Sequence, residues 1–150
     1  MASLSLKNVC KVYPNGFEAV KDFNLEVEDQ EFIIFVGPSG CGKSTLLNIM
    51  GLLDAPTSGT IQIAGVKIGG MKDKELAAFR NRNLGFVFQS FHLINSLNVL
   101  DNVEVPLLYR DVSAKERRQR AEEVLQKVGL SHRMHHMPSQ LSGGQCQRVA

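Results

Sequence analysis

The stretch FIIFVGPSGCGKST, residues 32–45, most constrains what this chain can fold into. Its first part, residues 32–36, is a continuous run of β-branched and aromatic side chains, which is typical of a strand buried on both faces of a sheet. Three glycines within residues 37–42 then require a loop, and a helical pattern follows over residues 43–53. A buried strand, a glycine-rich loop and a helix in this order predict an α/β protein.

Residues 37–44, GPSGCGKS, match the pattern G-x-x-x-x-G-K-[ST] between that strand and that helix. Glycines let backbone N–H groups curl around a phosphate, and the start of the helix adds unpaired N–H groups. Lys43 is placed to reach β- and γ-phosphates, and the Ser44 hydroxyl can ligate Mg²⁺. The alternative is a glycine-rich turn that binds nothing. We predict a nucleotide site formed by Gly37, Pro38, Ser39, Gly40, Cys41, Gly42, Lys43, Ser44 and Thr45.

Around this loop the hydrophobic pattern predicts further elements. Alternating apolar residues in 4–12 and 23–27 indicate half-buried strands, with the turn Pro14-Asn15-Gly16 between them. Residues 60–64 form a short strand candidate, and residues 84–88 a second buried strand. Residues 98–108 are expected to be helical at first. The clearest helix is 114–128, where Ser113 and Glu116 form a capping box.

Composition excludes several functional classes. The 150 residues carry a net charge of +2, which is too small to indicate nucleic acid as a partner. The apolar stretches fall short of the ~20 residues that a membrane-spanning helix needs, so we expect no direct membrane span. No charged segment followed by an apolar run is found at the start of the sequence, so we expect no secretory signal. The cysteines have neither disulfide nor zinc spacing, which favours a reduced cytosolic compartment; they are Cys10, Cys41 and Cys146.

Two polar clusters can each be interpreted as solvent-exposed surface or as a binding site. The basic residues of 115–120 are expected to be the solvated face of the helix 114–128, with phosphate or nucleic-acid contact as the alternative. His132, His135 and His136 lie in a polar segment, where histidines are more often solvated than bound to metal.

Read with the glycine-rich loop, two more motifs resemble those of the ABC ATPase family. Residues 88–90, FQS, are similar to its Q-loop, and residues 141–145, LSGGQ, to its signature motif. The spacing agrees with the family: 46 residues from Lys43 to Gln89 and 52 from Gln89 to Leu141. The resemblance covers essentially the whole chain. It implies a P-loop NTPase (RecA-like) core with an N-terminal antiparallel β-subdomain and a helical subdomain, divided at about 1–90 and 91–150.

The resemblance also implies roles for single residues. Tyr13 lies where the family has an aromatic residue that stacks on adenine; a strand-end tyrosine covering the core is the alternative. Gln89 would ligate Mg²⁺ with Ser44 and position water, so Lys43 and Gln89 are the catalytic candidates. In a head-to-tail dimer, the signature of one copy would close on the γ-phosphate at the other copy's P-loop. The signature candidates are Ser142, Gly143, Gly144 and Gln145, although SGGQ taken alone is also compatible with a flexible loop before a helix.

In the family, a Walker B aspartate, a catalytic glutamate and a switch histidine come after the signature helix, beyond Ala150. We therefore expect an N-terminal part of a longer ATPase, which by itself binds nucleotide weakly and does not turn it over. Residues 46–65 and 79–109 are most similar to the macrolide-exporter and lipoprotein-releasing branch. Residues 11–45 read more like a sugar-importer ATPase.

Together these features predict an ATP-binding subunit of an ABC transporter, with ATP and Mg²⁺ as cofactors. The resemblance implies a transmembrane permease subunit or domain as a partner, and hence a place at the inner face of the cytoplasmic membrane. Two alternatives stay open. One is a soluble ABC-type ATPase of DNA repair or translation, which zinc-spaced cysteines or a coiled-coil insertion would have favoured. The other is a non-catalytic nucleotide-binding fragment.

Overall fold

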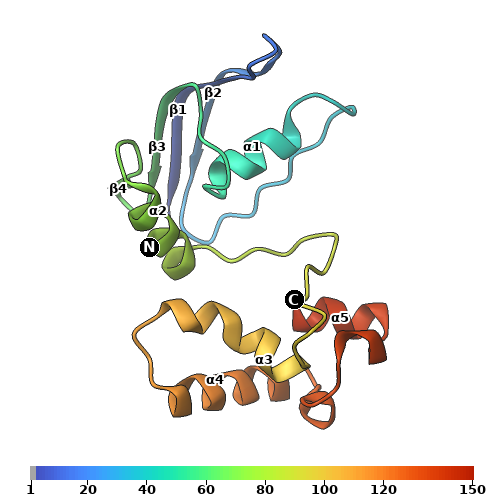
Figure 1. The fold of residues 1–150 in the computed structure, drawn as a ribbon. Coiled ribbons are helices and arrows are strands. Elements are labelled where there is room, and N and C mark those ends of the chain that lie inside the picture. The colour runs from blue at the N-terminus through green and yellow to red at the C-terminus, as the bar shows by residue number, and fades with distance from the viewer. Residues whose placement is uncertain (1–2) are drawn as a thin grey trace. The chain divides into compact units, whose positions relative to one another are not determined.

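The structure, a computed structural model, describes residues 3–150 of the chain. Its contacts divide the chain into two compact units, Met1–Leu84 and Gly85–Ala150. All the strands assigned in the described residues belong to the first unit, and the second contains helices and loops (Figure 1).

The first unit is built on a four-stranded antiparallel sheet in the order β2-β1-β3-β4 (Figure 1). The strands are β1 Leu4–Val12, β2 Glu18–Val27, β3 Ser58–Ile63 and β4 Val66–Lys67. In the register Leu6 lies opposite Leu25 on one side and Ile61 on the other. The strands predicted from the alternating pattern are confirmed, and so is the antiparallel β-subdomain that the resemblance implied.

Two helices complete this unit, α1 Lys43–Met50 and α2 Asp73–Asn83. α1 packs on the sheet because Ile49, on its buried side, joins the sheet residues in one core. α2 adds Leu76 and Phe79 at the margin of that core. The core residues are Leu6, Val9, Ile49, Leu52, Ile61, Ile63 and Ile68. Packing of α1 against the sheet fixes the direction in which the helix N-terminus points.

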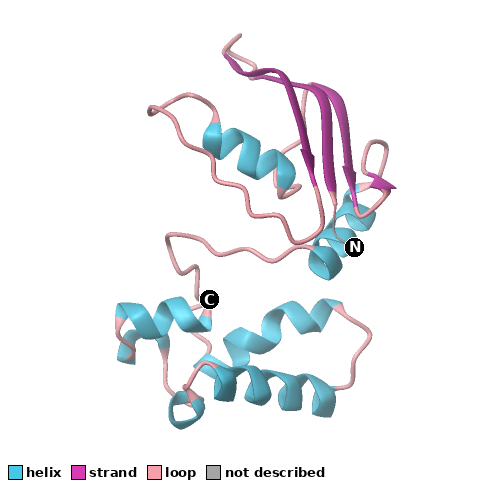
Figure 2. Cartoon of the chain, turned by 180° about the vertical axis from the view of Figure 1, so that it is seen from behind, coloured by secondary structure: helices cyan, strands magenta, loops and turns pink. Residues whose placement is uncertain are grey.

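Residues 32–36 and 84–88, predicted as buried strands, are not strands in the structure, and Figure 2 shows both as loop. Phe32 is 84% exposed and Val87 is 86% exposed. A strand needs a neighbour for its backbone N–H and C=O groups. Within residues 3–150 the sheet places no strand beside either segment. The hydrophobic pattern therefore predicted the wrong local structure for both segments of this chain.

The second unit is a small helical body (Figure 2). Its α-helices are α3 Val99–Glu104, α4 Ala114–Lys127 and α5 Gly143–Val149. Three 3₁₀ turns connect them: η1 Val105–Tyr109, η2 Ser131–Arg133 and η3 Pro138–Gln140. The three α-helices share one core, formed by Val99, Leu100, Ala121, Leu125, Leu130 and Val149.

The helix α4 confirms the segment predicted for 114–128 to within one residue. Its N-cap is Ser113, whose side chain accepts a hydrogen bond from the Glu116 N–H at 3.2 Å. Its basic face is not only solvated. Arg118 contacts the carboxylates of Asp101 and Glu104 on α3, at 3.5 and 3.4 Å, so part of the basic cluster joins two helices.

Within residues 3–150 no helix has the length and apolar character needed to cross a bilayer.

Candidate nucleotide-binding site

The glycine-rich loop, residues 37–42, leads directly into α1, and its last residue is the N-cap of the helix. Gly40 and Gly42 have φ values of +81° and +90°, in the left-handed region that favours glycine. A Cβ atom on Gly42 would lie 2.4 Å from the Ala19 carbonyl oxygen on β2. Backbone conformation and close packing against a strand therefore both require glycine at position 42.

The Lys43 side chain folds back over the loop that precedes it. Its ammonium donates hydrogen bonds to the carbonyl oxygens of Gly37 at 2.8 Å and Pro38 at 2.6 Å. It also lies 3.4 Å from the Cys41 Sγ. These partners are neutral, so the positive charge at the centre of the loop is not compensated by them. A phosphate next to the loop would meet that charge at short range.

The start of α1 adds to this positive field. The first N–H groups of an α-helix have no partner within the helix, and they point along its axis with the positive end of the helix dipole. No acidic side chain occupies the first turn of α1. Ser44, the next residue after Lys43, is exposed in this turn. A cavity of about 290 Å³ adjoins the loop, and Lys43, Cys41 and Phe35 contribute to its lining. The arrangement can hold an anion.

Tyr13 lies beside this helix terminus. It follows β1 at the start of a tight turn, where its N–H donates to the Phe17 carbonyl at 2.9 Å. Its hydroxyl lies 3.4 Å from the Thr45 Oγ1, in the first turn of α1. The fold thus brings together two predicted site residues that are 32 positions apart. Adenine stacking on Tyr13 stays a prediction.

Gln89 belongs to the second unit, whereas Lys43 and Ser44 belong to the first. It is exposed in a loop. Its neighbour Phe88 stacks on Phe86, with ring centroids 5.6 Å apart. The Phe88 carbonyl accepts a hydrogen bond from the Gln147 Nε2 at 3.4 Å, which joins this loop to α5. Shared Mg²⁺ ligation by Gln89 and Ser44 remains a prediction.

The signature residues form the N-terminus of α5, so the segment is not a flexible loop in this structure. Ser142 is the N-cap, and its N–H donates to the Gln145 Oε1 at 2.8 Å in a capping box. Gly143 and Gly144 occupy the first two helical positions. Both have negative φ values, and a Cβ on Gly144 would meet no atom within 4 Å. Nothing within the described chain therefore requires glycine at position 144.

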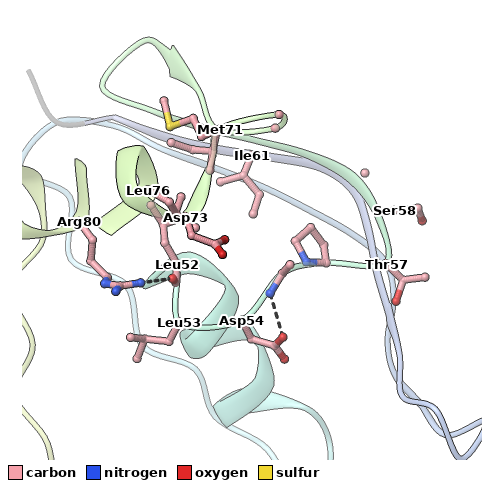
Figure 3. A pocket seen from close by; sticks show the side chains of 16 residues that line it. Leu52, Leu53, Asp54, Thr57, Ser58, Ile61, Met71, Asp73, Leu76 and Arg80 are labelled. Carbon is pink, nitrogen blue, oxygen red and sulfur yellow. Dashed lines mark hydrogen bonds between the residues drawn. The ribbon is translucent and has the colours of Figure 1, made fainter. Parts of the chain in front are cut away.

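A larger cavity, of about 650 Å³, lies elsewhere in the first unit (Figure 3). Its described lining residues run from Leu52 to Arg80, so it is separate from the glycine-rich loop. The Arg80 Nη1 donates to the Leu52 carbonyl at 2.7 Å at its margin (Figure 3). The features that suit a phosphate, an uncompensated cation and a helix N-terminus, belong to the glycine-rich loop and not to this larger cavity.

The histidine cluster has no metal geometry. His136 Nε2 lies 2.8 Å from the Arg133 Nη1, and within the described part of the chain no three His, Cys, Asp or Glu side chains converge.

Comparison with known proteins agrees with this architecture. The ABC transporter family matches residues 20–150. An uncharacterized ABC transporter ATP-binding protein of Bacillus subtilis, YknY, is 53% identical over 98% of this chain and 65% of its own length. The macrolide export ATP-binding/permease protein MacB of Salmonella typhimurium is 47% identical over 99% of this chain and 24% of its own length. The chain thus spans less than two thirds of both relatives.

Among solved structures, a dimeric structure of a post-hydrolysis state of the ATP-binding cassette MJ0796, bound to ADP and Pi, superimposes with a TM-score of 0.86. The two sequences are 46% identical, and the match covers 97% of this chain and 66% of the other. The fold and the loop ahead of α1 define a P-loop NTPase. The chain belongs to the ABC transporter family.

Proposed function

We propose that this chain is the ATP-binding part of an ABC transporter subunit, which couples ATP binding and hydrolysis to transport or release of a substrate. One observation carries the proposal. Lys43 donates only to neutral groups of a left-handed glycine loop at the N-terminus of α1, where a triphosphate would be bound. Similarity to ATP-binding proteins such as YknY supports ATP as the nucleotide.

The residue roles follow from the chemistry of these groups. Backbone N–H groups of residues 37 and 39–45 bind the phosphates, with Pro38 shaping the loop; Lys43 neutralises their charge, and Ser44 and Gln89 ligate Mg²⁺. Mg²⁺ would supply further charge neutralisation at the β- and γ-oxygens. Tyr13 stacks on the adenine. The division of roles follows the predicted domains, with the β-subdomain and P-loop core in 1–90 and the helical subdomain in 91–150.

The signature residues are proposed to act on a second copy in a head-to-tail dimer. Gly144 has no internal reason to be glycine, and a backbone N–H without a neighbouring Cβ allows close approach of an external anion. The dimeric structure of the related cassette MJ0796 supports this arrangement. The 150-residue chain by itself is proposed to bind nucleotide without turnover.

The proposed location is the inner face of the cytoplasmic membrane, where a permease subunit or domain would hold the ATP-binding part. MacB, whose printed name joins ATP-binding and permease functions, supports a permease partner.

The test is a Lys43→Ala substitution in the full-length protein, assayed for Mg-ATP binding and hydrolysis. Loss of a charged hydrogen bond of about 1.5–3 kcal/mol should weaken ATP binding by about 10- to 100-fold and abolish turnover. Lys67→Ala, an exposed lysine on β4, is the matched control and should keep both. Unchanged ATP affinity in Lys43→Ala would rule out the proposed site.

A further inference from the structure

We propose that Lys11 is a positioning residue for the nucleotide base, acting through Tyr13. The inference rests on the proposed ATP-binding function. Lys11 was not singled out by the sequence motifs, yet its Nζ lies over the ring of Tyr13, which follows the end of β1. The role is to hold the Tyr13 ring in one orientation, with one ring face covered by the ammonium and the other available to a purine.

The contacts of Lys11 are short and largely removed from solvent. Its Nζ lies 2.6 Å from the Asp54 Oδ1 and 2.7 Å from the Ala55 carbonyl oxygen. It also lies 5.2 Å from the centroid of the Tyr13 ring, within cation–π range. The Lys11 side chain is only 13% exposed, so these contacts are less screened than those of a surface lysine.

The partner carboxylate also has a backbone hydrogen bond of its own. The Asp54 Oδ1 accepts a hydrogen bond from the Ala55 N–H at 2.8 Å, as the dashed line in Figure 3 shows. The turn that follows α1 is also bound to the end of β1. The Thr57 N–H donates to the Cys10 carbonyl, and the Val12 N–H donates to the Thr57 Oγ1, both at 2.9 Å. The ammonium therefore has a defined place.

Tyr13 is consequently held at two points. The ammonium covers its ring, and its hydroxyl lies 3.4 Å from the Thr45 Oγ1 in the first turn of α1. A ring that is already oriented loses less conformational entropy when a base stacks on it, so binding of the base is stronger. Lys11 and Asp54 form a neutral pair, so replacing both together, as Lys11→Met/Asp54→Asn, should change the field at the P-loop phosphates little.

A purely structural role for Lys11 predicts a different result. If the ion pair only held the turn after α1 in place, its loss would disturb the P-loop helix and weaken every ligand of the loop equally. A positioning role weakens only ligands that carry a base. Nucleotide and base-free triphosphate therefore separate the two roles.

The experiment compares Mg-ATP with Mg-tripolyphosphate by equilibrium titration of the full-length protein and its Lys11→Met/Asp54→Asn variant, in which both charges of the pair are removed. We expect ATP to bind about fivefold more weakly to the variant, because the Tyr13 ring must then be ordered when the base binds. Tripolyphosphate affinity should be unchanged. Lys7→Met is the matched control, because Lys7 lies on the same strand but is 65% exposed. Lys11→Arg, which keeps the cation, should restore most of the ATP affinity.

The outcomes are distinct. Equal weakening of ATP and tripolyphosphate, or no change in either, overturns the positioning role. If the double variant does not fold, Lys11→Gln/Asp54→Asn provides the same comparison, because it removes both charges and keeps polar side chains at both positions; a loss confined to ATP is again required. A wild-type protein that binds neither ligand would contradict the proposed function, which is a separate failure.

Discussion

At the scale of single residues, the glycines of the P-loop differ in the reason why glycine is required. Gly40 is constrained by its left-handed backbone alone, because a Cβ there would meet no atom within 4 Å. Gly42 is constrained twice, by its φ of +90° and by the Ala19 carbonyl at 2.4 Å from an added Cβ. The motif match therefore understates the role of Gly42, which also sets the distance between α1 and β2.

Gly42→Ala should be the most destabilising substitution in the loop. An L-residue in the left-handed region costs roughly 1–2 kcal/mol, and the contact with Ala19 must be relieved in addition. Gly65→Ala, with φ of +78° and open space around its Cβ, is the control and should show the backbone cost alone. Chemical denaturation measures both, and equal losses of unfolding free energy would contradict the close approach.

At the scale of elements, the N-termini of two helices show how well capping residues can be predicted from sequence. Ser113 caps α4 and Ser142 caps α5, each through its own hydroxyl. The first was predicted from an S-x-x-E pattern. The second was not predicted, because LSGGQ was interpreted as a signature motif. Its S-x-x-Q spacing nevertheless has the form of a capping box.

Ser113→Ala should lower the unfolding free energy by about 1 kcal/mol, because the Glu116 N–H loses its acceptor. Ser139→Ala, an exposed residue in η3, serves as the control and should change stability little. The comparison is made by denaturant unfolding monitored by far-UV circular dichroism. Identical midpoints for the two variants would show that the cap contributes nothing.

Gly144→Ala separates stability from function. Alanine favours the helix over glycine by up to about 1 kcal/mol, and no atom lies near the added methyl group, so α5 should become more stable. ATP turnover of the full-length protein should nevertheless fall, because the methyl group would obstruct the approach of a second copy's nucleotide. Thermal unfolding and a turnover assay on the same preparation measure both. A variant that is more stable and fully active would remove the signature role.

At the scale of the whole molecule, sequence patterns predicted elements that are stabilised by neighbours close in the chain. The β1–β2 hairpin, with its predicted turn, and α4 are of this kind, and both were correct. The strands predicted at residues 32–36 and 84–88 were wrong, because an apolar pattern indicates a preference for burial and not the presence of a pairing strand. The contact between Tyr13 and Thr45 could not be predicted from sequence, because it forms only when the β1–β2 hairpin packs beside α1. The contact between Lys11 and Asp54 could not be predicted either, because neither residue belongs to a recognisable motif.

The two exposed apolar segments give a prediction for hydrogen exchange. In the 150-residue chain, the amides of residues 32–36 should exchange at rates typical of loops, while those of β1 are protected by two neighbouring strands. In a protein of the relatives' length, we expect additional strands to protect residues 32–36. Mass-spectrometric exchange on both proteins measures this, and strong protection already in the shorter chain would contradict the loop assignment.

The most direct test of the central claim is a structure of the full-length protein with Mg²⁺ and a non-hydrolysable ATP analogue. The account predicts the triphosphate at the N-terminus of α1, with the Lys43 ammonium turned from the Gly37 and Pro38 carbonyls toward the phosphate oxygens. A nucleotide bound elsewhere, for example in the 650 Å³ cavity between Leu52 and Arg80, with Lys43 still on those carbonyls, would contradict it.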